Sequence, residues 1–288
     1  MQKARDIRRR IRSVQSTRQI THTMEMVAAS KMRRAEERVR AARPYAGKLS
    51  EVISGLFAPD LAERYPILRQ PEEIRRSALI LLTSNRGLAG AFNVNLIRLA
   101  RTRLEELRAD GVDVEFHVVG RKGLSFFRFR REKMASERID ITDRPSMADA
   151  HSLIDPLIPC FERGELDAVD IVYAQFKSAL STPPALMRVL PVEPAGGNAA
   201  RASNYIFSPS SEDILTFVLP LYVRNAVYRA LVETAAAEQG ARRTAMKNAT
   251  DNADELIKTL TRRYNTARQS QITQELTEIT GGAEALRG

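Results

Sequence analysis

Residues 272–286 read ITQELTEITGGAEAL and end a long helical pattern that begins near residue 211. Apolar side chains recur in this stretch at Ile272, Leu276 and Ile279, which is the spacing of one helix face. A helix over residues 211–286 would extend roughly 110 Å, at about 1.5 Å per residue. Because a single helix of this length cannot bury a core on itself, the sequence predicts a partner helix.

The partner that the sequence offers is the N-terminal segment, residues 1–57, because both segments carry the 3-4 spacing of a coiled-coil seam. The N-terminal seam positions are Ile7, Ile11, Val14, Arg18, Thr21, Glu25, Ala28, Met32, Ala35, Val39 and Ala42. The C-terminal seam positions are Met246, Ala249, Ala253, Leu256 and Leu260, followed by Arg263. We therefore expect two antiparallel helices, with the longer C-terminal helix, residues 208–287, projecting beyond the N-terminal one.

The middle of the N-terminal seam is polar. Polar residues take the seam positions from Arg18 to Glu25, while apolar residues lie on a neighbouring face, at Ile20, Met24 and Val27. This change of face disfavours a self-pairing homodimer and favours a helix that touches different partners along its length.

The central region, residues 75–195, alternates predicted strands with predicted helices. The strands are 77–82, 112–119, 169–176 and 186–192, and the helices are 93–109 and 146–163. This alternation is typical of βαβ units and a mostly parallel sheet. The predicted fold class is therefore α/β, with a long antiparallel coiled coil of N- and C-terminal helices plus a central Rossmann-like βαβ domain.

Three residues that disfavour helix, and one linker, are expected to interrupt these elements. Pro44 and Gly47 are expected to break or bend the first helix, and Pro220 to kink or offset the start of the last one. Residues 194–204 are expected to form a flexible linker, because they combine Pro, Gly, Asn and Ser with small side chains.

Charge and cysteine content narrow the class of protein. The net charge is +10 and the sequence pI is about 10.0. Residues 1–43 carry 13 Lys and Arg against 4 Asp and Glu, so nearly all of the excess is N-terminal and favours acidic partners. The single cysteine, Cys160, excludes an internal disulfide and fits a reducing compartment.

No targeting or membrane segment is predicted. Met1 is followed by a charged helix rather than an apolar signal core. The longest apolar stretch, residues 214–223, is about half the ~20 residues that a membrane span needs, and Pro220 interrupts it. We expect a chain that docks on a membrane complex without crossing the membrane.

Two loops lie where a nucleotide-binding fold would hold phosphate, at residues 83–93 and 120–123. Neither matches G-x-G-x-x-G or a P-loop, so both are interpreted as structural turns. Cys160 lies on an apolar helix face without a triad pattern nearby, and we expect a buried thiol there rather than a nucleophile.

The remaining titratable residues do not form a catalytic or metal constellation. His22, His117 and His151 lack metal-ligand spacing. Glu275 and Glu278 share a helix face, but a general acid and base need a pocket that a lone helix does not provide. The sequence therefore predicts no catalytic residue, no cofactor and no metal site.

The last third of the C-terminal helix carries a polar cluster, Arg268, Gln269, Thr273 and Glu275. This cluster is either a solvated face or a reversible polar contact with a surrounding protein. The apolar residues from Ile272 onward have no partner helix, so they are either exposed or enclosed in a sleeve. We favour the sleeve, because an exposed apolar stripe invites aggregation.

Residues 272–285 closely resemble the C-terminal signature of the gamma subunits of F-type ATP synthases. The signature positions are filled by Ile272, Thr273, Glu275, Glu278, Gly282, Ala283 and Ala285. Residues 20–33, 245–253 and 264–269 resemble further blocks of the same family in the same order. The resemblance spans the chain, with one departure at Asn85, where the family commonly carries an acidic residue before Arg-Gly-Leu.

This resemblance implies a rotating shaft. The terminal helices would form an asymmetric coiled coil inside the hexamer of alpha and beta subunits. The βαβ domain would lie below it, against the epsilon subunit and the membrane rotor ring of c subunits. Proton flow would turn the ring and this chain together, driving each catalytic beta subunit through its states. The chain itself would hydrolyse nothing, and it would be peripheral to the cytoplasmic face of the plasma membrane.

The same resemblance implies roles for particular residues. Acidic loops of the beta subunits would meet the basic N-terminal helix at Arg8, Arg9, Arg10, Lys31, Arg33 and Arg34. Further beta-subunit contacts would be Met24, Arg268, Gln269, Thr273 and Glu275. The tip would sit in an apolar bearing through Ile272, Leu276 and Ile279. Because they are apolar and lie beside the linker, we expect Tyr205, Ile206 and Phe207 to form the foot on the membrane ring.

Two alternatives stay open at this point. A nucleic-acid-binding coiled coil would explain the basic N-terminus, but residues 1–44 contain no Phe, Tyr or Trp for base stacking. A βαβ enzyme with helical arms would explain the central region, but it lacks a phosphate loop. The regulatory cysteine pair of chloroplast family members is impossible here, because Cys160 is alone.

Overall fold

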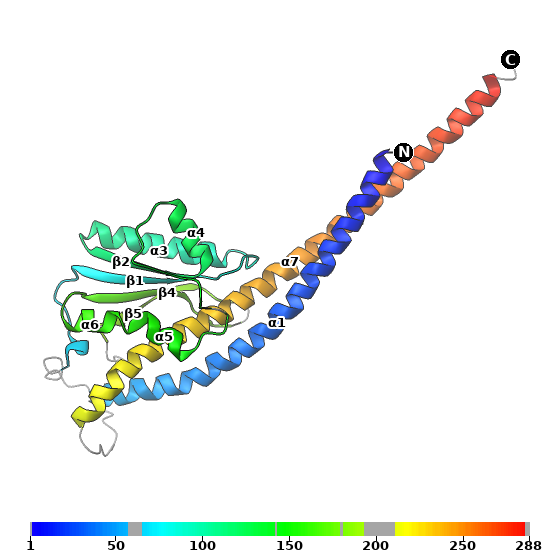
Figure 1. Ribbon diagram of the computed structural model, residues 1–288. Helices are drawn as coiled ribbons and strands as arrows, with labels where there is room; N and C mark the ends of the chain where they lie inside the picture. Colours follow the sequence, from blue (N-terminus) through cyan, green and yellow to red (C-terminus); the bar gives the residue numbers. More distant parts are fainter. Residues whose placement is uncertain (1, 57–64, 142, 179–180, 193–210, 286–288) are drawn as a thin grey trace. The chain divides into compact units, whose positions relative to one another are not determined.

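The computed structural model describes residues 2–56, 65–141, 143–178, 181–192 and 211–285. They belong to two compact units, one of Met1–Val27 with Arg243–Gly288 and one of Ala28–Arg242. Two long helices, α1 (Gln2–Leu56) and α7 (Ser211–Ala285), contribute residues to both units (Figure 1).

The larger unit is built on a five-stranded sheet. The strands are β1 (Arg76–Leu82), β2 (Asp113–Val119), β3 (Ser136–Arg138), β4 (Ala168–Ala174) and β5 (Pro184–Leu190), in the order β3-β2-β1-β4-β5. Four strands run parallel, and β5 pairs antiparallel with β4. The prediction of a mostly parallel sheet in an α/β fold is therefore confirmed.

Both faces of the sheet are covered, which is why β4 is buried at every position and β1 at every position after Arg76. The helices α3 (Phe92–Ala109) and α4 (Arg121–Phe129) pack on one face, and α5 (Met147–Ile154), α6 (Leu157–Glu162) and α7 on the other (Figure 1). A short 3-10 helix, η1 (Pro66–Leu68), adds two buried side chains to the second face.

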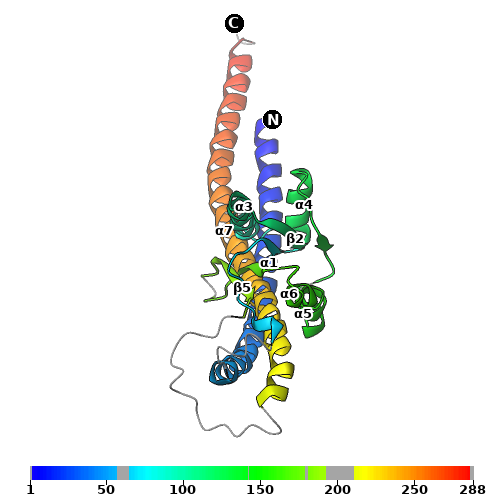
Figure 2. The same cartoon turned by 90° about the vertical axis from the view of Figure 1, so that its left-hand side faces the viewer.

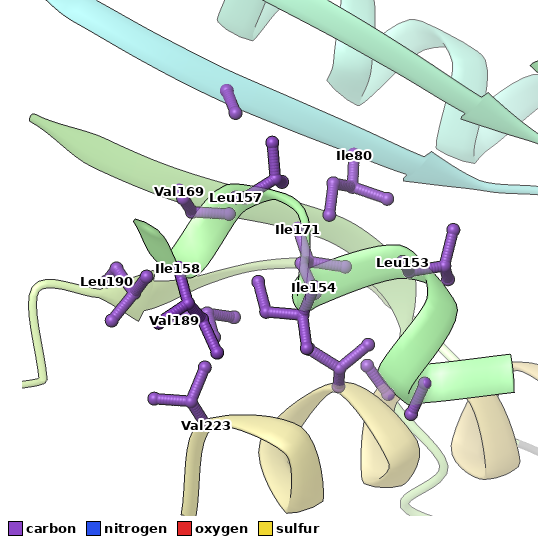
Figure 3. Packing of buried hydrophobic residues seen from close by; sticks show 14 of the residues in the cluster. Ile80, Leu153, Ile154, Leu157, Ile158, Val169, Ile171, Val189, Leu190 and Val223 are labelled. Atoms are coloured by element: carbon purple, nitrogen blue, oxygen red, sulfur yellow. The ribbon is translucent and has the colours of Figure 1, made fainter. Parts of the chain in front are cut away.

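Alternate residues of β1 face the two cores. Leu79 and Leu81 belong to the cluster under α3 and α4, and Ile80 belongs to the cluster under α5, α6 and α7. Figure 3 shows this second cluster, where Ile80 and Ile154 lie close to side chains of the neighbouring elements. Its labelled members are Ile80, Leu153, Ile154, Leu157, Ile158, Val169, Ile171, Val189, Leu190 and Val223.

The predicted helix over residues 146–163 is wrong, because the chain forms two helices there. The first begins with a capping box in which Ser146 Oγ accepts from the amide of Asp149. It ends before Pro156, which has no N–H to donate to the preceding turn. The sequence reading also missed α4 and the three-residue strand β3.

Neither long helix is broken at its prolines, so of the predicted break or bend near Pro44 only a bend remains. The first helix continues through Pro44 and Gly47 and curves in its second half (Figure 1), and the last continues through Pro220. A proline inside a helix costs about 3 kcal/mol. Buried neighbours such as Ala42 and Leu49 supply the packing that offsets this cost.

The stretch of α7 at residues 231–240 is buried at every position. Small side chains such as Ala236 and Ala237 allow the sheet and α1 to approach it closely. Its two acidic residues are not left unpaired: Glu233 Oε2 accepts from the amide of Phe176 at 3.2 Å, and Glu238 pairs with Arg242 at 2.6 Å. Burial raises the pKa of Glu238 above its ordinary value.

Candidate functional site

The smaller unit is a pair of helices, formed by residues 2–27 of α1 and 243–285 of α7. Met246, Ala253 and Leu260 are buried as the seam predicts. Leu256 is 47% exposed, so that seam position does not lie in the interface. On the α1 side, Ile7, Ile11 and Val14 are half-buried.

The polar middle of the seam is paired across the interface. Thr21 Oγ1 lies 2.8 Å from Thr250 Oγ1, and both residues are buried. One turn away, Arg18 Nε lies 2.5 Å from Asp254 Oδ1. Thr21 therefore stays buried in the helix pair because Thr250 supplies a polar partner, whereas Arg18 and Asp254 pair at its half-exposed edge.

The neighbouring apolar face of α1 is turned to solvent. Ile20, Met26 and Val27 are each more than half exposed, and Met24 is half-buried. These side chains lie outside the interface between the two helices, as the predicted change of apolar face requires. Burying this face would require a partner outside the described part of the chain.

Within the described residues, no helix faces the end of α7. Figure 2 shows the C-terminal part of α7 (red) extending past the N-terminal end of α1 (blue). Its apolar residues Ile272, Leu276 and Ile279 are 49%, 59% and 68% exposed. The predicted projecting tip is therefore present, with an apolar stripe on a helix that has polar side chains around it.

The polar residues expected to touch the beta subunits beside this tip are also exposed. They are Arg268, Gln269, Thr273 and Glu275. Thr273 Oγ1 donates to the carbonyl of Gln269 at 3.0 Å, and Gln271 donates to Glu275 at 3.0 Å. These bonds link residues of one helix, so they leave the outward-facing side of the cluster available for another protein.

The basic residues of α1 divide into two kinds. Arg8, Arg9, Arg10 and Arg33 are exposed, as is Arg34, whose guanidinium donates to Ser30. Lys31 differs, because its Nζ lies 2.7 Å from Asp143 Oδ2 and lowers the pKa of that carboxyl. The structure thus assigns Lys31 an internal partner that the sequence did not predict. The expected foot, Tyr205, Ile206 and Phe207, lies outside the described residues.

The two loops at the carboxyl ends of β1 and β2 close on one another. Gly120 has φ of 99°, and a Cβ there would lie 2.1 Å from the carbonyl oxygen of Thr83. The side-chain amide of Asn85 donates from Nδ2 to the carbonyls of Ile139 and Ile141, which ties the first loop to the segment after β3. These contacts pack the two loops against each other and against residues 139–141.

His117 and Cys160 each lie within the packed part of the larger unit, and burial shifts the pKa of both. His117 Nδ1 lies 2.8 Å from Ser136 Oγ in the sheet, and burial lowers its pKa. Cys160 is free and half-buried rather than fully buried as expected, and desolvation raises its pKa. Among the described residues, no group of His, Cys, Asp or Glu could hold a metal ion. None of the described helices is long and apolar enough to cross a membrane.

Comparisons with known proteins agree over the full length. A family model described as ATP synthase matches residues 3–286. The chain is 59% identical over 290 residues to the ATP synthase gamma chain of Gemmatimonas aurantiaca, covering 100% of both. It is 45% identical over 288 residues to that of Desulfitobacterium hafniense, covering 99% and 100%. The chain belongs to the ATP synthase gamma chain family.

Solved structures share the fold at lower identity. The rotor of the Euglena gracilis mitochondrial ATP synthase matches with a TM-score of 0.63 at 22% identity, covering 94% of this chain and 99% of that one. A second structure of that enzyme, containing OSCP, F1 and the c-ring, matches with a TM-score of 0.66, covering 99% and 94%. The gamma-chain resemblance seen in the sequence is confirmed.

Proposed function

We propose that this chain is the central-stalk rotor subunit of an F-type ATP synthase. It couples ion-driven rotation of the membrane ring to sequential conformational change, and so to ATP synthesis or hydrolysis, at the catalytic beta subunits. Family membership favours this function over a nucleic-acid-binding coiled coil and over a βαβ enzyme. The single observation that carries the proposal is the projecting tip of α7, whose apolar stripe has no partner within the described chain.

A bearing explains the tip better than a solvated helix end does. Ile272, Leu276 and Ile279 lie on one face at helical spacing, and all three are about half exposed or more. Enclosure in an apolar sleeve of the alpha and beta hexamer would remove this surface from water. A sleeve without directional bonds also allows a helix to turn inside it, because burial of apolar surface is non-directional.

An uneven surface explains how rotation reaches the beta subunits. The helix pair presents apolar residues near Ile20 and Val27, arginines at Arg8 and Arg9, and polar residues from Arg268 to Glu275. A beta subunit therefore meets a different surface at each angle of rotation. Differential contact of this kind shifts a neighbour's conformational equilibrium, which is what coupling requires.

The chain itself performs no chemistry under this proposal. The turns at the carboxyl edge of the sheet are held by Gly120, Thr83 and Asn85, and neither matches a phosphate-binding loop. The catalytic sites lie on the beta subunits, and the epsilon subunit and the c subunits of the membrane ring complete the partners. Association with that ring makes the chain a peripheral protein at the cytoplasmic face of the plasma membrane, with Tyr205, Ile206 and Phe207 as its foot.

Co-expression with the alpha and beta subunits of the same organism tests this function. We expect one copy of the chain to co-purify with each hexamer. Replacing Ile272, Leu276 and Ile279 together by Ser should remove most of the chain-dependent change in ATP hydrolysis. Val94, an equally exposed apolar residue on α3, provides the matched control as Val94→Ser. A chain that leaves the hexamer and its hydrolysis rate unchanged would refute the rotor function.

A further inference from the structure

The C-terminal end of α4 forms a tight hydrogen-bonded turn. The amide of Arg131 donates to the carbonyl of Arg128 at 2.9 Å, and the amide of Glu132 donates to the carbonyl of Phe127 at 3.0 Å. This pair of bonds is the Schellman motif, which requires a left-handed residue and usually uses glycine. Here that residue is Arg131, with φ of 54°. A residue with a Cβ is strained in this conformation, so the arginine is kept at a cost to stability.

The same turn exposes an aromatic ring. Phe129 is 88% exposed, more than any other large apolar residue in the described ranges. Its neighbours on the helix behave differently, since Leu124 and Phe127 are buried in the core under α3 and α4. The ring of Phe129 therefore takes no part in holding α4 on the sheet.

Three exposed cations follow Phe129 within four residues of the chain. Arg130, Arg131 and Lys133 are all exposed, and none has an acidic partner within the part of the chain that the structure describes. The three acidic residues nearby in the sequence are already paired: Glu132 with Arg108, Glu137 with Arg128 and Asp140 with Arg138. The turn thus combines an apolar side chain with an excess of positive charge.

The helix dipole alone does not account for this arrangement. Cations near a helix C-terminus are favourable, which would explain Arg130. The dipole does not favour an exposed phenylalanine, and it does not favour an arginine where glycine would remove the strain. Both features are explained if the turn binds another molecule.

We propose that Phe129, Arg130, Arg131 and Lys133, together the α4 turn, dock an acidic segment of a partner protein. The phenyl ring enters an apolar pocket of the partner, and the partner's carboxylates pair with the three cations. The hydrogen-bonded turn fixes the backbone that carries this single ring, which suits a shaped protein pocket. A membrane surface would favour several apolar side chains, and a nucleic acid would favour a longer basic groove.

This inference rests on the proposed function, because the partner is another subunit of the same complex. The test therefore uses the full chain co-expressed with the subunits of its own ATP synthase. A photo-crosslinking benzoyl-phenylalanine replaces Phe129, and in a second preparation it replaces Ser125, an exposed position of the same helix. After irradiation, crosslinked peptides are identified by mass spectrometry.

We expect position 129 to crosslink to one Asp- and Glu-rich segment of a partner subunit, and position 125 to give no such product. Adding Arg130→Glu and Lys133→Glu should lower the yield roughly tenfold, because the charges then repel the partner. Arg121→Glu, at the other end of α4, should leave the yield unchanged. Crosslinking to lipid or nucleic acid, or no product at position 129, would overturn the proposal.

The strained arginine gives a second measurement. Arg131→Gly relieves the left-handed strain, so its melting temperature should rise while the crosslinking yield from position 129 falls. A purely structural role predicts no fall in yield. Co-purification of the chain with the hexamer is scored in the same preparations. An assembled complex without a crosslink refutes the docking surface alone, whereas failure to assemble refutes the rotor function.

Discussion

Helix α7 contains two stretches of one element in opposite surroundings. Residues 231–240 are buried at every position, while residues 272–280 are exposed at every position. The buried stretch uses small side chains that fit a closed space, and the exposed stretch repeats a branched apolar residue on one face. The same secondary structure therefore contributes to the core in one place and, under the proposed function, is available to other proteins in another.

The sharpest way to test this contrast is the same substitution at two sites of α7. Leu219 is 1% exposed in the core, and Leu276 is 59% exposed at the tip. Leu219→Ala should lower the free energy of unfolding by about 2–5 kcal/mol, because it leaves a cavity. Leu276→Ala should change it by less than about 0.5 kcal/mol. Urea denaturation of the full chain measures both, and equal losses at the two sites would break the comparison.

The polar layer of the helix pair should behave differently from the apolar seam around it. Thr21→Val leaves the Thr250 hydroxyl without its partner on α1 and should cost about 1 kcal/mol. Thr21→Val combined with Thr250→Val should cost less than the sum of the two single changes, because both hydroxyls are then gone. A double-mutant cycle in urea provides the coupling, and simple additivity would show that the two hydroxyls do not interact.

The sheet should be sensitive to acid through His117. Burial lowers the pKa of this side chain below 6.5, so the folded chain holds fewer protons than the unfolded chain just below that pH. Stability should therefore fall as the pH drops through about 6.5 toward the lowered pKa. His117→Gln should flatten this fall relative to the parent chain, when unfolding is compared between about pH 8 and about pH 5. If the stability of the variant falls with pH as steeply as that of the parent chain, His117 is not the cause of the acid sensitivity.

The smallest effect is expected at the ion pair of Arg18 and Asp254. Both side chains are about half exposed, so solvent screens their attraction. Arg18→Gln should lower the free energy of unfolding by about 0–1 kcal/mol, and added salt should reduce the difference further. A loss as large as that at Leu219 would mean that this polar layer stabilises the helix pair as strongly as the core stabilises the sheet.

Much of the architecture followed from periodicity, because long apolar patterns reflect burial along whole elements. The seam, the strands β1, β2, β4 and β5, and the projecting tip are of this kind. Local chemistry was harder to predict. The breaker preference of Pro44 was overridden by packing around Ala42 and Leu49, whereas Pro156 did divide a helix. The tendency of proline to end a helix does not by itself predict whether tertiary packing will keep the helix continuous.

The candidate site divides in the same way. The exposed tip and its polar cluster could be predicted, because their residues lie on one helix. Partners distant in sequence could not, such as Lys31 with Asp143 or Thr21 with Thr250. The exposed Phe129 was also missed, because a nine-residue helix with three phenylalanines gives no sign of which aromatic ring faces out.

The enclosed stretch of α7 also restricts how the length of this chain can vary. One inserted residue would turn everything after it by about 100° around the helix axis. At residues 231–240 such a rotation would place a different side chain in every packed position. Because all ten residues are buried, no exposed face could accept the displaced side chains. Insertions and deletions are therefore expected to be absent from these ten positions in viable variants, which makes them a fixed point for aligning gamma chains of unequal length.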